Sequence, residues 1–286
     1  MKTILVATDL AIPSENAARY TLGLAKKIKA DILLCNAIKV DRQSDLFFQP
    51  RMPIQNYLAQ KNAIDLQLGF LANKLRADID TTVRSYIPII SFTSRTGSIT
   101  EVLREVQEEQ KIDMVVMGMY GAPEISKLLL GSKTAAMLEK INLPLLLVPF
   151  SMFSSQLNHV AFASELCEHE MSAIAFLLEI VRAYSATLSI VHIIKDDHVD
   201  NQQQNQVEDF FNRVSAMANY SKVNLKQIEN TEIDAGLKQL GKHGAIEMLA
   251  MVHHRDSILK RIFTIGHAQK MASNSSIPLL VFPATE

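Results

Sequence analysis

The chain has 286 residues, of which 48% are hydrophobic and 21% are charged, so it is long enough for two domains that each bury a core. Its 29 basic and 30 acidic residues give a net charge of -1, which excludes a basic surface for nucleic acid or for an anionic membrane. No apolar run approaches the about 20 residues that span a bilayer, and no secretory signal precedes Asp9. We therefore expect a cytoplasmic protein that binds neither nucleic acid nor membrane.

The first half of the chain alternates between strand and helix patterns. Short unbroken apolar runs are typical of strands buried on both faces, and apolar residues spaced by three and four predict helices. The runs predict strands at 3–7, 32–38, 85–92, 114–117 and 145–148. The helical spacings predict helices at 13–28, 58–75, 97–110 and 131–140, with a surface excursion at 39–53. Pro88 favours an edge position for the third strand, and Gly97 with Ser98 indicates a turn and a helix cap.

The second half repeats this order. It predicts strands at 160–163, 188–194, 223–228, 246–252 and 279–282. It predicts helices at 171–184, 207–220, 233–241 and 266–272. Strands that alternate with helices indicate parallel βαβ units with helices on both faces of the sheet.

Two sequence matches, in the same order in each half, indicate a duplication. Residues 144–149 (PLLLVP) match 278–283 (PLLVFP), and residues 4–9 (ILVATD) match 160–165 (VAFASE). We therefore expect two α/β domains, at 1–150 and 157–286, with a serine-rich linker over 150–156.

The loop after the fourth predicted strand has the chemistry of a polyphosphate cradle. Gly118 and Gly121 are followed by nine residues and then by Gly131 and Ser132. Glycines let a ligand approach the backbone closely, and the free N–H groups at a helix start favour phosphate. The hydroxyl groups that follow, and Lys133, add donors and positive charge. In open α/β sheets such loops lie at the carboxyl ends of the strands, where ligands bind.

This spacing, G-x2-G-x9-G-[ST], resembles the ATP-binding signature of the universal stress protein family, and nearly the whole chain looks like two tandem copies of that family. The resemblance implies an α/β fold of two tandem open-sheet, Rossmann-like domains of the adenine nucleotide alpha hydrolase-like type, each with a five-stranded parallel sheet and helices on both faces. It also implies an ATP site, with or without Mg²⁺, in which Asp9 contacts the adenosine end and the backbone near Ala37 and Ile38 meets the adenine. The implied nucleotide site comprises Ala7, Thr8, Asp9, Ile38, Gly118, Met119, Gly121, Gly131, Ser132, Lys133 and Thr134.

The second half keeps the spacing of the signature but not its chemistry. We align His253 with the first glycine and Asp256 with the second, and His267 with the signature hydroxyl. An aspartate where phosphates would lie is electrostatically adverse, and Glu165 retains only the acid of the first strand. We therefore expect no tight ATP binding there. We expect this half to pack on the first, as the two subunits do in the dimer of single-domain relatives.

All eight histidines lie in the second half, so a metal or pH-sensing site around His253, His254 and His267 is a hypothesis to weigh. Adjacent histidines point in different directions, and no cysteine or carboxylate stands at a recognisable ligand spacing. We therefore predict no metal site. We expect Cys35 to be a core residue and Cys167 to be an ordinary residue at a helix start.

These features favour an ATP-binding regulator of a stress response that acts on an unidentified protein partner and is compatible with a homodimer. We identify no catalytic residue, since the loop sequence shows neither a general base nor an arginine clamp. Two alternatives stay open: a weak ATPase or phosphotransferase, and a structural interaction protein with no working nucleotide site.

Overall fold

The computed structural model describes residues 2–38, 54–80, 82, 85–119, 142–152, 155–194, 201–229, 246–253 and 277–283. The first half contains β1 (Lys2–Ala7), α1 (Ile12–Ile28), β2 (Ala30–Ile38), α2 (Ile54–Ala77), β3 (Ile90–Thr96), α3 (Ile99–Glu109), β4 (Met114–Met119) and β5 (Leu145–Pro149). The second half contains β6 (His159–Ala163), α5 (Glu170–Tyr184), β7 (Thr187–Ile194), α6 (Asn201–Ala218), β8 (Val223–Glu229), β9 (Met248–His253) and β10 (Leu279–Pro283). The helices predicted at 131–140, 233–241 and 266–272, and the excursion at 39–53, lie outside the described residues.

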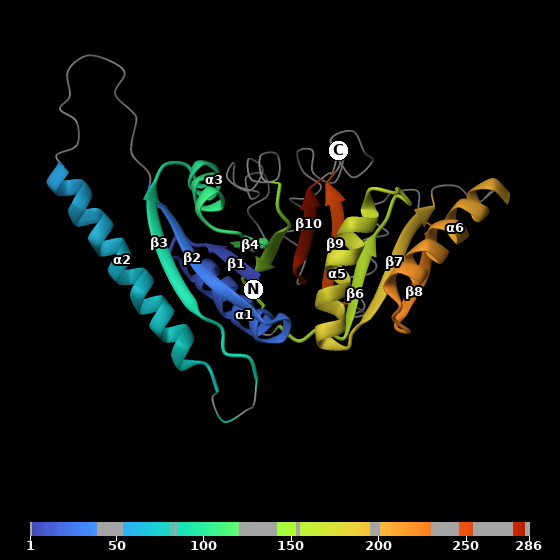
Figure 1. The fold of residues 1–286 in the computed structure, drawn as a ribbon, viewed down its shortest axis with the longest axis horizontal. Coiled ribbons are helices and arrows are strands. Elements are labelled where there is room, and N and C mark those ends of the chain that lie inside the picture. The colour runs from blue at the N-terminus through green and yellow to red at the C-terminus, as the bar shows by residue number, and fades with distance from the viewer. Residues whose placement is uncertain are drawn as a thin grey trace, which may run out of the picture.

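All strands belong to one twisted ten-stranded sheet in the order β3-β2-β1-β4-β5-β10-β9-β6-β7-β8 (Figure 1). Within each half the five strands are parallel, and the second half repeats the strand order of the first. The sequence prediction of an α/β fold with two five-stranded parallel sheets is confirmed. The sequence did not foresee that the two sheets join into one.

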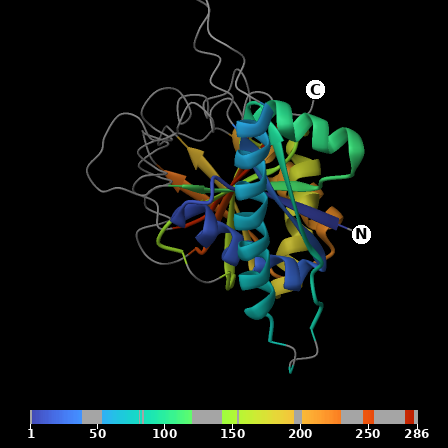
Figure 2. The same cartoon turned by 90° about the vertical axis from the view of Figure 1, so that its left-hand side faces the viewer.

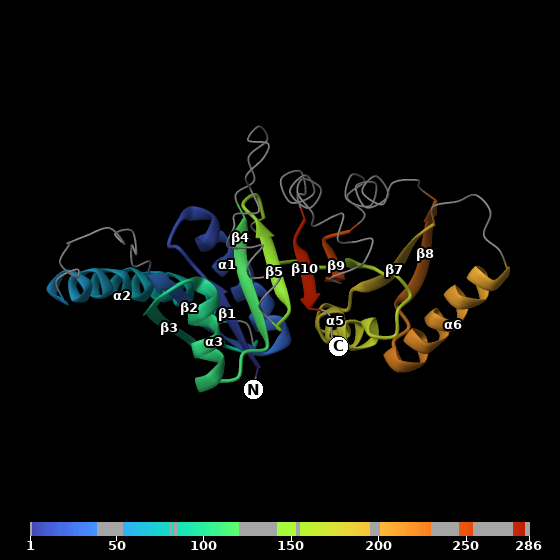
Figure 3. The same cartoon turned by 90° about the horizontal axis from the view of Figure 1, so that it is seen from above.

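Apolar side chains cover both faces of the sheet and form two cores. One core contains the buried residues of α1, α2, α5 and α6, and the other contains those of α3. Figure 3 shows α2 and α6 at opposite ends of the molecule and α3 on the other side of the sheet from α1. The central strands read as continuous apolar runs because both of their faces are covered.

The third strand lies at the edge of the sheet, as Pro88 suggests, but the predicted range 85–92 is wrong. The strand β3 is Ile90–Thr96 and pairs with β2 from Ile32↔Ile90 to Ile38↔Thr96. Before it, the backbone N–H of Ile89 donates to the side chain of Asp31 (2.9 Å) and therefore lies outside the ladder. An edge strand leaves part of its surface to solvent, so its polar second half carries no apolar signal in the sequence.

The helix ends follow local sequence rules. Pro13 lies in the first turn of α1, where a missing N–H costs nothing, and Lys29 ends that helix in a left-handed conformation (φ 57°). Ser98 caps α3 in a reciprocal capping box with Glu101, which confirms the predicted cap. Among the helices that the structure describes, none is long and apolar enough to cross a membrane.

The two halves meet at β5 and β10, which pair antiparallel. Leu146 lies opposite Leu280, and both side chains are fully buried. Beside this seam α1 packs against α5, where the Lys27 ammonium lies 5.6 Å from the centre of the Tyr184 ring. Phe176 of α5 also meets a β10 phenylalanine edge-on, with ring centroids 5.6 Å apart. The seam is therefore a packed core that is continuous across both halves.

Truncating a side chain at this seam should be costly. We expect Leu146→Ala to lower the free energy of unfolding by about 2–5 kcal/mol, since it removes buried apolar surface and leaves a cavity. Urea unfolding followed by circular dichroism measures the change. Ile87→Ala, at a side chain that is 55% exposed, is the control and should change stability by no more than about 0.5 kcal/mol. Equal effects of the two substitutions would show that the seam is not a core.

Candidate functional site

The candidate site lies where β1, β2 and β4 end side by side. Ala7 pairs with Cys35 on one side and with Met117 on the other, so β1 ends here while β2 continues three residues farther, to Ile38, and β4 two residues farther, to Met119. From β1 the chain continues to β2 and β3 on one side of β1, and it then returns to β4 on the other side. The direction of the strand order therefore switches between β1 and β4. Ligands of open α/β sheets bind in the crevice at this position.

The loop between β1 and α1 is held by a chain of hydrogen bonds. The Thr8 hydroxyl donates to Ser14 Oγ (2.9 Å), and the Ser14 hydroxyl donates to Asp9 Oδ1 (2.9 Å). Thr8 Oγ1 also accepts the Leu10 N–H (3.0 Å), and Asp9 Oδ1 accepts the Ala11 N–H (3.1 Å). Leu10 has a left-handed backbone (φ 64°), so the loop turns sharply there. This arrangement leaves the side chain of Asp9 exposed at the rim of the sheet.

Two further residues of this loop escaped the sequence analysis. Ser14 is buried and connects Thr8 with Asp9, and the Asn36 amide donates to the Thr8 carbonyl (2.8 Å) from β2. A signal for both was present, because polar residues also stand 6 and 28 positions after Ser164 in the second half. The match between the halves therefore extends beyond the strand that first revealed it.

Gly118 brings the end of β4 into contact with the backbone of α1. A Cβ atom built on Gly118 would lie 2.2 Å from the Pro13 carbonyl oxygen and 2.9 Å from the Ser14 nitrogen. No side chain fits in this space, so glycine is required by packing as well as by any ligand. The first glycine of the signature thus lies directly against the helix start beside Asp9.

The remaining predicted site residues fall into two groups. Ile38 ends β2 with its side chain buried, and its carbonyl accepts the Gly97 N–H (3.0 Å). Met119 ends β4, and its side chain belongs to the apolar core on the α3 face. The structure thus brings Ala7, Thr8, Asp9 and Gly118 together, with Ile38 at the end of the neighbouring strand. The predicted phosphate-loop residues outside the described ranges are Gly121, Gly131, Ser132, Lys133 and Thr134.

The second half builds the same turn with a different side chain at its centre. Leu166 has φ 63°, and its N–H donates to Ser164 Oγ (3.0 Å), as Leu10 does to Thr8. Glu170 takes the place of Ser14, six residues after the hydroxyl. Its carboxylate accepts the Ser164 hydroxyl (2.6 Å) and the Glu165 N–H (2.9 Å). A carboxylate of the chain itself therefore takes the place that the Ser14 hydroxyl has in the first half.

The Glu170 carboxylate is completely buried, and burial raises its pKa to about 6. Hydrogen bonds from Ser164 and from the backbone of Glu165 and Cys167 oppose this rise, and the negative charge of Glu165 adds to it. His192 replaces Asn36 in this half, with Nδ1 3.0 Å from the Ser164 carbonyl oxygen. The carboxyl group is thus enclosed by the turn and is partly protonated near pH 6.

The alignment of His253 with the first glycine is wrong by one residue. Ala7 pairs with Met117, and its counterpart Ala163 pairs with Met251, so Val252 takes the place of Gly118. A bulky, buried side chain therefore stands where the first half has none. In agreement with this larger side chain, the helix that follows the turn begins later in the second half. The helix α1 begins four residues after Thr8, whereas α5 begins six residues after Ser164. The alignments of Asp256 and His267 lie outside the described residues.

No metal site emerges from the part of the chain that the structure describes, which holds no group of three histidine, cysteine or acidic residues close enough to bind an ion. His253 ends β9, while His254 and His267 lie outside the described ranges. Cys35 is fully buried, and burial raises its pKa to about 12, as expected for a core residue. Burial and the nearby Glu170 and Glu165 carboxylates also raise the pKa of Cys167, which argues against a reactive thiolate.

Comparison with known proteins agrees with this architecture. The model of the universal stress protein family matches residues 1–149, and the chain belongs to that family. Comparison with curated protein sequences gave no match.

Several solved structures match almost the full length of the chain, including these three. A universal stress protein from Archaeoglobus fulgidus DSM 4304 has a TM-score of 0.75 at 18% identity, covering 99% of this chain and 98% of its own. A Pseudomonas aeruginosa UCBPP-PA14 protein assigned to the same family has a TM-score of 0.60 at 13% identity, covering 99% and 93%. The cytoplasmic domain of a prokaryotic cation chloride cotransporter has a TM-score of 0.57 at 13% identity, covering 98% and 94%. At these identities the likeness shows the fold alone.

Two glycine substitutions should have opposite effects. We expect Gly118→Ala to lower the free energy of unfolding by about 1–3 kcal/mol, because its Cβ would overlap the Pro13 carbonyl. Gly69→Ala, within α2, is the matched control, since its Cβ would lie at an ordinary 3.6 Å from the Phe92 ring. It should raise stability by about 0.5–1 kcal/mol through helix propensity. Thermal and urea unfolding measure both, and a harmless Gly118→Ala would contradict the close contact.

The buried Glu170 carboxyl should make stability fall as pH rises. Its pKa of about 6 in the folded chain exceeds the ordinary 4.5, so the folded state binds the proton more tightly. This contribution is complete below the ordinary pKa and is lost as the pH rises through about 6, a change of about 2 kcal/mol.

Glu170→Gln removes this titration while keeping an acceptor for the Glu165 N–H. Subtracting its unfolding free energies from those of the unaltered chain, across pH 4 to 8, isolates the contribution of Glu170. The difference should decline with rising pH by about 2 kcal/mol. A difference that stays flat with pH would mean that Glu170 titrates normally.

Proposed function

We propose that this universal stress protein binds one ATP per chain in its first half and acts as a nucleotide-dependent regulator of a stress response. Residues 1–150 form the nucleotide-binding domain, and residues 157–286 form a domain whose motif is degenerate. The observation that carries the proposal is the β1–α1 loop, which presents Asp9 beside Gly118 at the switch in strand order.

The geometry of the loop suits the adenosine end of a nucleotide. Asp9 is exposed, while its Oδ1 atom is anchored by the Ala11 N–H and the Ser14 hydroxyl, so its carboxylate is positioned before a ligand arrives. Beside it β1 ends at Ala7 and β2 continues to Ile38, so Ala7, Thr8 and Ile38 contribute backbone at the rim. Pre-positioned hydrogen-bonding groups reduce the entropic cost of binding a ligand.

The phosphates would lie along the glycine signature. Gly118 and Met119 begin that loop from β4, and Gly121, Gly131 and Ser132 complete the pattern with main-chain N–H groups and a hydroxyl. Lys133 and Thr134 would supply a charge and a further donor. Mg²⁺ would accompany the triphosphate as its usual counterion.

Two features of the second half disfavour a nucleotide there. The Glu170 carboxylate already accepts the Ser164 hydroxyl and the Glu165 N–H, and it would repel an anionic ligand. Val252 fills the position of Gly118 at the end of the central strand. Binding in the first half alone would let the nucleotide favour one conformation of the chain, which a partner protein reads by population shift.

Replacing the acid in each half provides a matched pair. We expect Asp9→Ala to raise the dissociation constant of ATP at least about 10-fold, because a lost hydrogen bond to a charged group costs about 1.5–3 kcal/mol. Glu165→Ala, the same change in the second half, should leave the constant unchanged. Isothermal titration with ATP and Mg²⁺ measures both affinity and stoichiometry, and we expect one site per chain.

Three outcomes would contradict the proposal. The absence of binding at millimolar ATP would favour a structural role, and two sites per chain would contradict the assignment to the first half. Hydrolysis of labelled ATP in a single turnover, lost in Ser132→Ala, would indicate an enzyme.

Mass spectrometry of the nucleotide released from the native protein would identify the ligand directly. We expect no released nucleotide from Gly131→Val.

A further inference from the structure

The exposed apolar surface of this chain is concentrated in its first half. Among the residues that the structure describes, the large apolar side chains with marked exposure are Ile12, Leu58, Leu66, Phe70, Ile87, Ile89, Phe92 and Phe150. None of them belongs to the second half, although its fold is the same. The two with the highest exposure, Leu66 at 76% and Phe70 at 72%, both lie on α2.

The exposed face of α2 has the periodicity of a helix–helix seam. Six of its exposed residues lie in one row, namely Ala59, Ala63, Leu66, Phe70, Asn73 and Ala77, and the other exposed residues beside this row are Leu58, Gln60, Asn62, Gln67 and Arg76. The six residues of the row are separated by alternating steps of four and three, which is the spacing of the contact positions between two packed helices. We call these six residues the α2 stripe. The opposite face of the helix, with Leu68 and Leu75, already packs on the sheet, so the stripe is a second packing face.

The charges of α2 lie beside the stripe and are paired within the chain. Lys61 pairs with Asp65, and both contact Ser94 of β3. Lys74 pairs with Glu15 of α1. The third cation, Arg76, donates to the side chain of the stripe residue Asn73 (2.8 Å) and to the Ile90 carbonyl. The six stripe residues are themselves uncharged, and one guanidinium lies at the C-terminal end of the stripe.

A hollow lies next to the two largest residues of the stripe. The pocket has a volume of about 380 Å³ and is lined by Leu10, Glu15, Leu66, Gln67, Phe70, Leu71 and Lys74. The same surface thus has both projecting apolar side chains and a recess, whose lining is apolar at four residues and polar at Glu15, Gln67 and Lys74. A self-complementary surface, which can pair with its own copy, needs both features.

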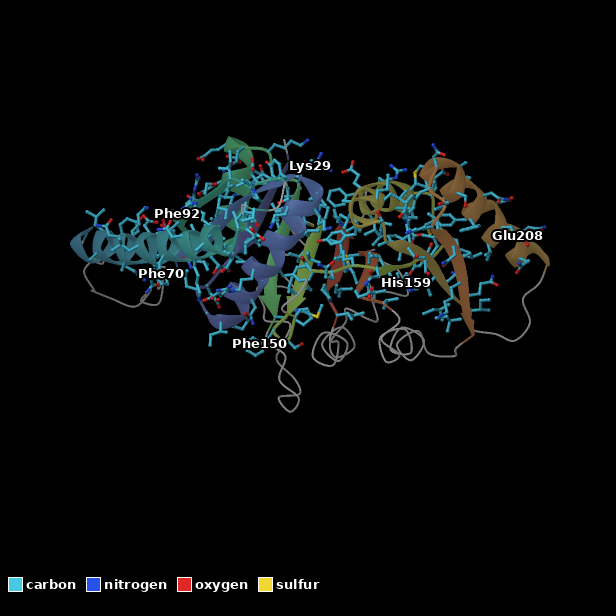
Figure 4. All side chains as sticks on the ribbon, turned by 90° about the horizontal axis from the view of Figure 1, so that it is seen from below. Lys29, Phe70, Phe92, Phe150, His159 and Glu208 are labelled. Carbon is cyan, nitrogen blue, oxygen red and sulfur yellow. The ribbon has the colours of Figure 1, made fainter. Side chains whose placement is uncertain are left out.

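The equivalent helix of the second half serves as an internal control. From residue 204 to the end of α6, the exposed residues are Gln204, Asn205, Gln206, Glu208, Asp209, Asn212, Arg213 and Ala216. All but Ala216 are polar or charged, as expected for a helix that faces water. Figure 2 shows α2 as the outermost element at its end of the molecule, and Figure 4 places Phe70 and Phe92 there, far from Glu208 at the other end. The fold alone therefore does not require an apolar outer helix.

We propose that the α2 stripe binds the α2 stripe of a second copy of this chain, with the two helices antiparallel and centred at Leu68. In that register Leu66 meets Phe70 of the second copy. Ala63 meets Asn73, and Ala59 meets Ala77 at the two ends. Large side chains thus meet in the middle and small ones at the ends, and each contact occurs twice, as a two-fold axis requires.

The charges beside the seam are compatible with the same register. Lys74 lies across from Asn62 of the second copy, and Arg76 lies across from Gln60, so no like charges face one another. If the stripe bound an unrelated protein, the sizes of its side chains would not need to be symmetric about Leu68. The symmetry of size and the absence of facing like charges therefore favour a second copy as the occupant.

The mass of the full chain in solution tests the interface. We expect a mass twice the 31.9 kDa of one chain by light scattering and sedimentation equilibrium. Leu66→Asp should halve that mass, because it places two like charges at the centre of the seam. Asn212→Asp, which adds the same charge to α6, should leave the mass doubled. A far-ultraviolet circular dichroism spectrum that matches that of the unaltered chain shows that each variant is folded.

Disulfide cross-linking tests the orientation. In a Cys167→Ser background, the double variant Ala63→Cys/Asn73→Cys should form a covalent dimer on oxidation, while each single variant should not. The two cysteines of one chain lie 10 residues apart on one helix, about 15 Å, too far to bond to each other.

Several outcomes would overturn the proposal. These are a monomer at every soluble concentration, a dimer that survives Leu66→Asp, and cross-linking by the Ala63→Cys single variant, which would indicate parallel helices. A monomer in which a thiol at Leu66→Cys is protected from alkylation would show that the chain covers the stripe itself. None of these results depends on nucleotide binding.

Discussion

The backbone pairing between β5 and β10 is the constraint on which the arrangement of the whole molecule depends. Each half alone would expose its fifth strand as an unpaired edge, with Leu145–Pro149 on one side and Leu279–Pro283 on the other. Exposed apolar edges favour uncontrolled association. Pairing them inside one chain removes both edges at once and brings α1 against α5, so the two apolar cores become continuous across the seam.

Because the halves share one fold, the β1–α1 loop and its counterpart between β6 and α5 can be compared residue by residue. The turn is the same in both, with Leu10 and Leu166 in the left-handed conformation. In one loop a serine hydroxyl connects Thr8 to an exposed aspartate. In the other a buried glutamate accepts the loop's own donors. A buried carboxylate of the chain thus satisfies the hydrogen-bond donors of the second loop, so the turn keeps its shape with a different side chain at its centre.

The sequence predicted what depends on local pattern and missed what depends on contacts between distant segments. The central strands were predictable because burial on both faces gives unbroken apolar runs. The range of β3 was not predictable, since an edge strand that contains Ser94 and Arg95 has no unbroken apolar run. The sequence also predicted that Thr8, Asp9 and Gly118 belong to one site, and the structure brings these three residues to the same rim of the sheet. Two features could not be predicted from spacing along the chain, because they depend on the register of the sheet. These are the contact of Gly118 with Pro13 and the position of Val252, one residue after the partner of Ala163, where the first half has Gly118.

Joining the halves covalently changes how the seam responds to dilution. Nine residues, 150–158, lie between β5 and β6, so the second half is always close to the first. Two separate single-domain chains would part when their concentration falls below the dissociation constant, whereas tethered halves keep a fixed effective concentration. The ten-stranded sheet is therefore insensitive to how much of the protein is made, and its integrity is a property of folding alone.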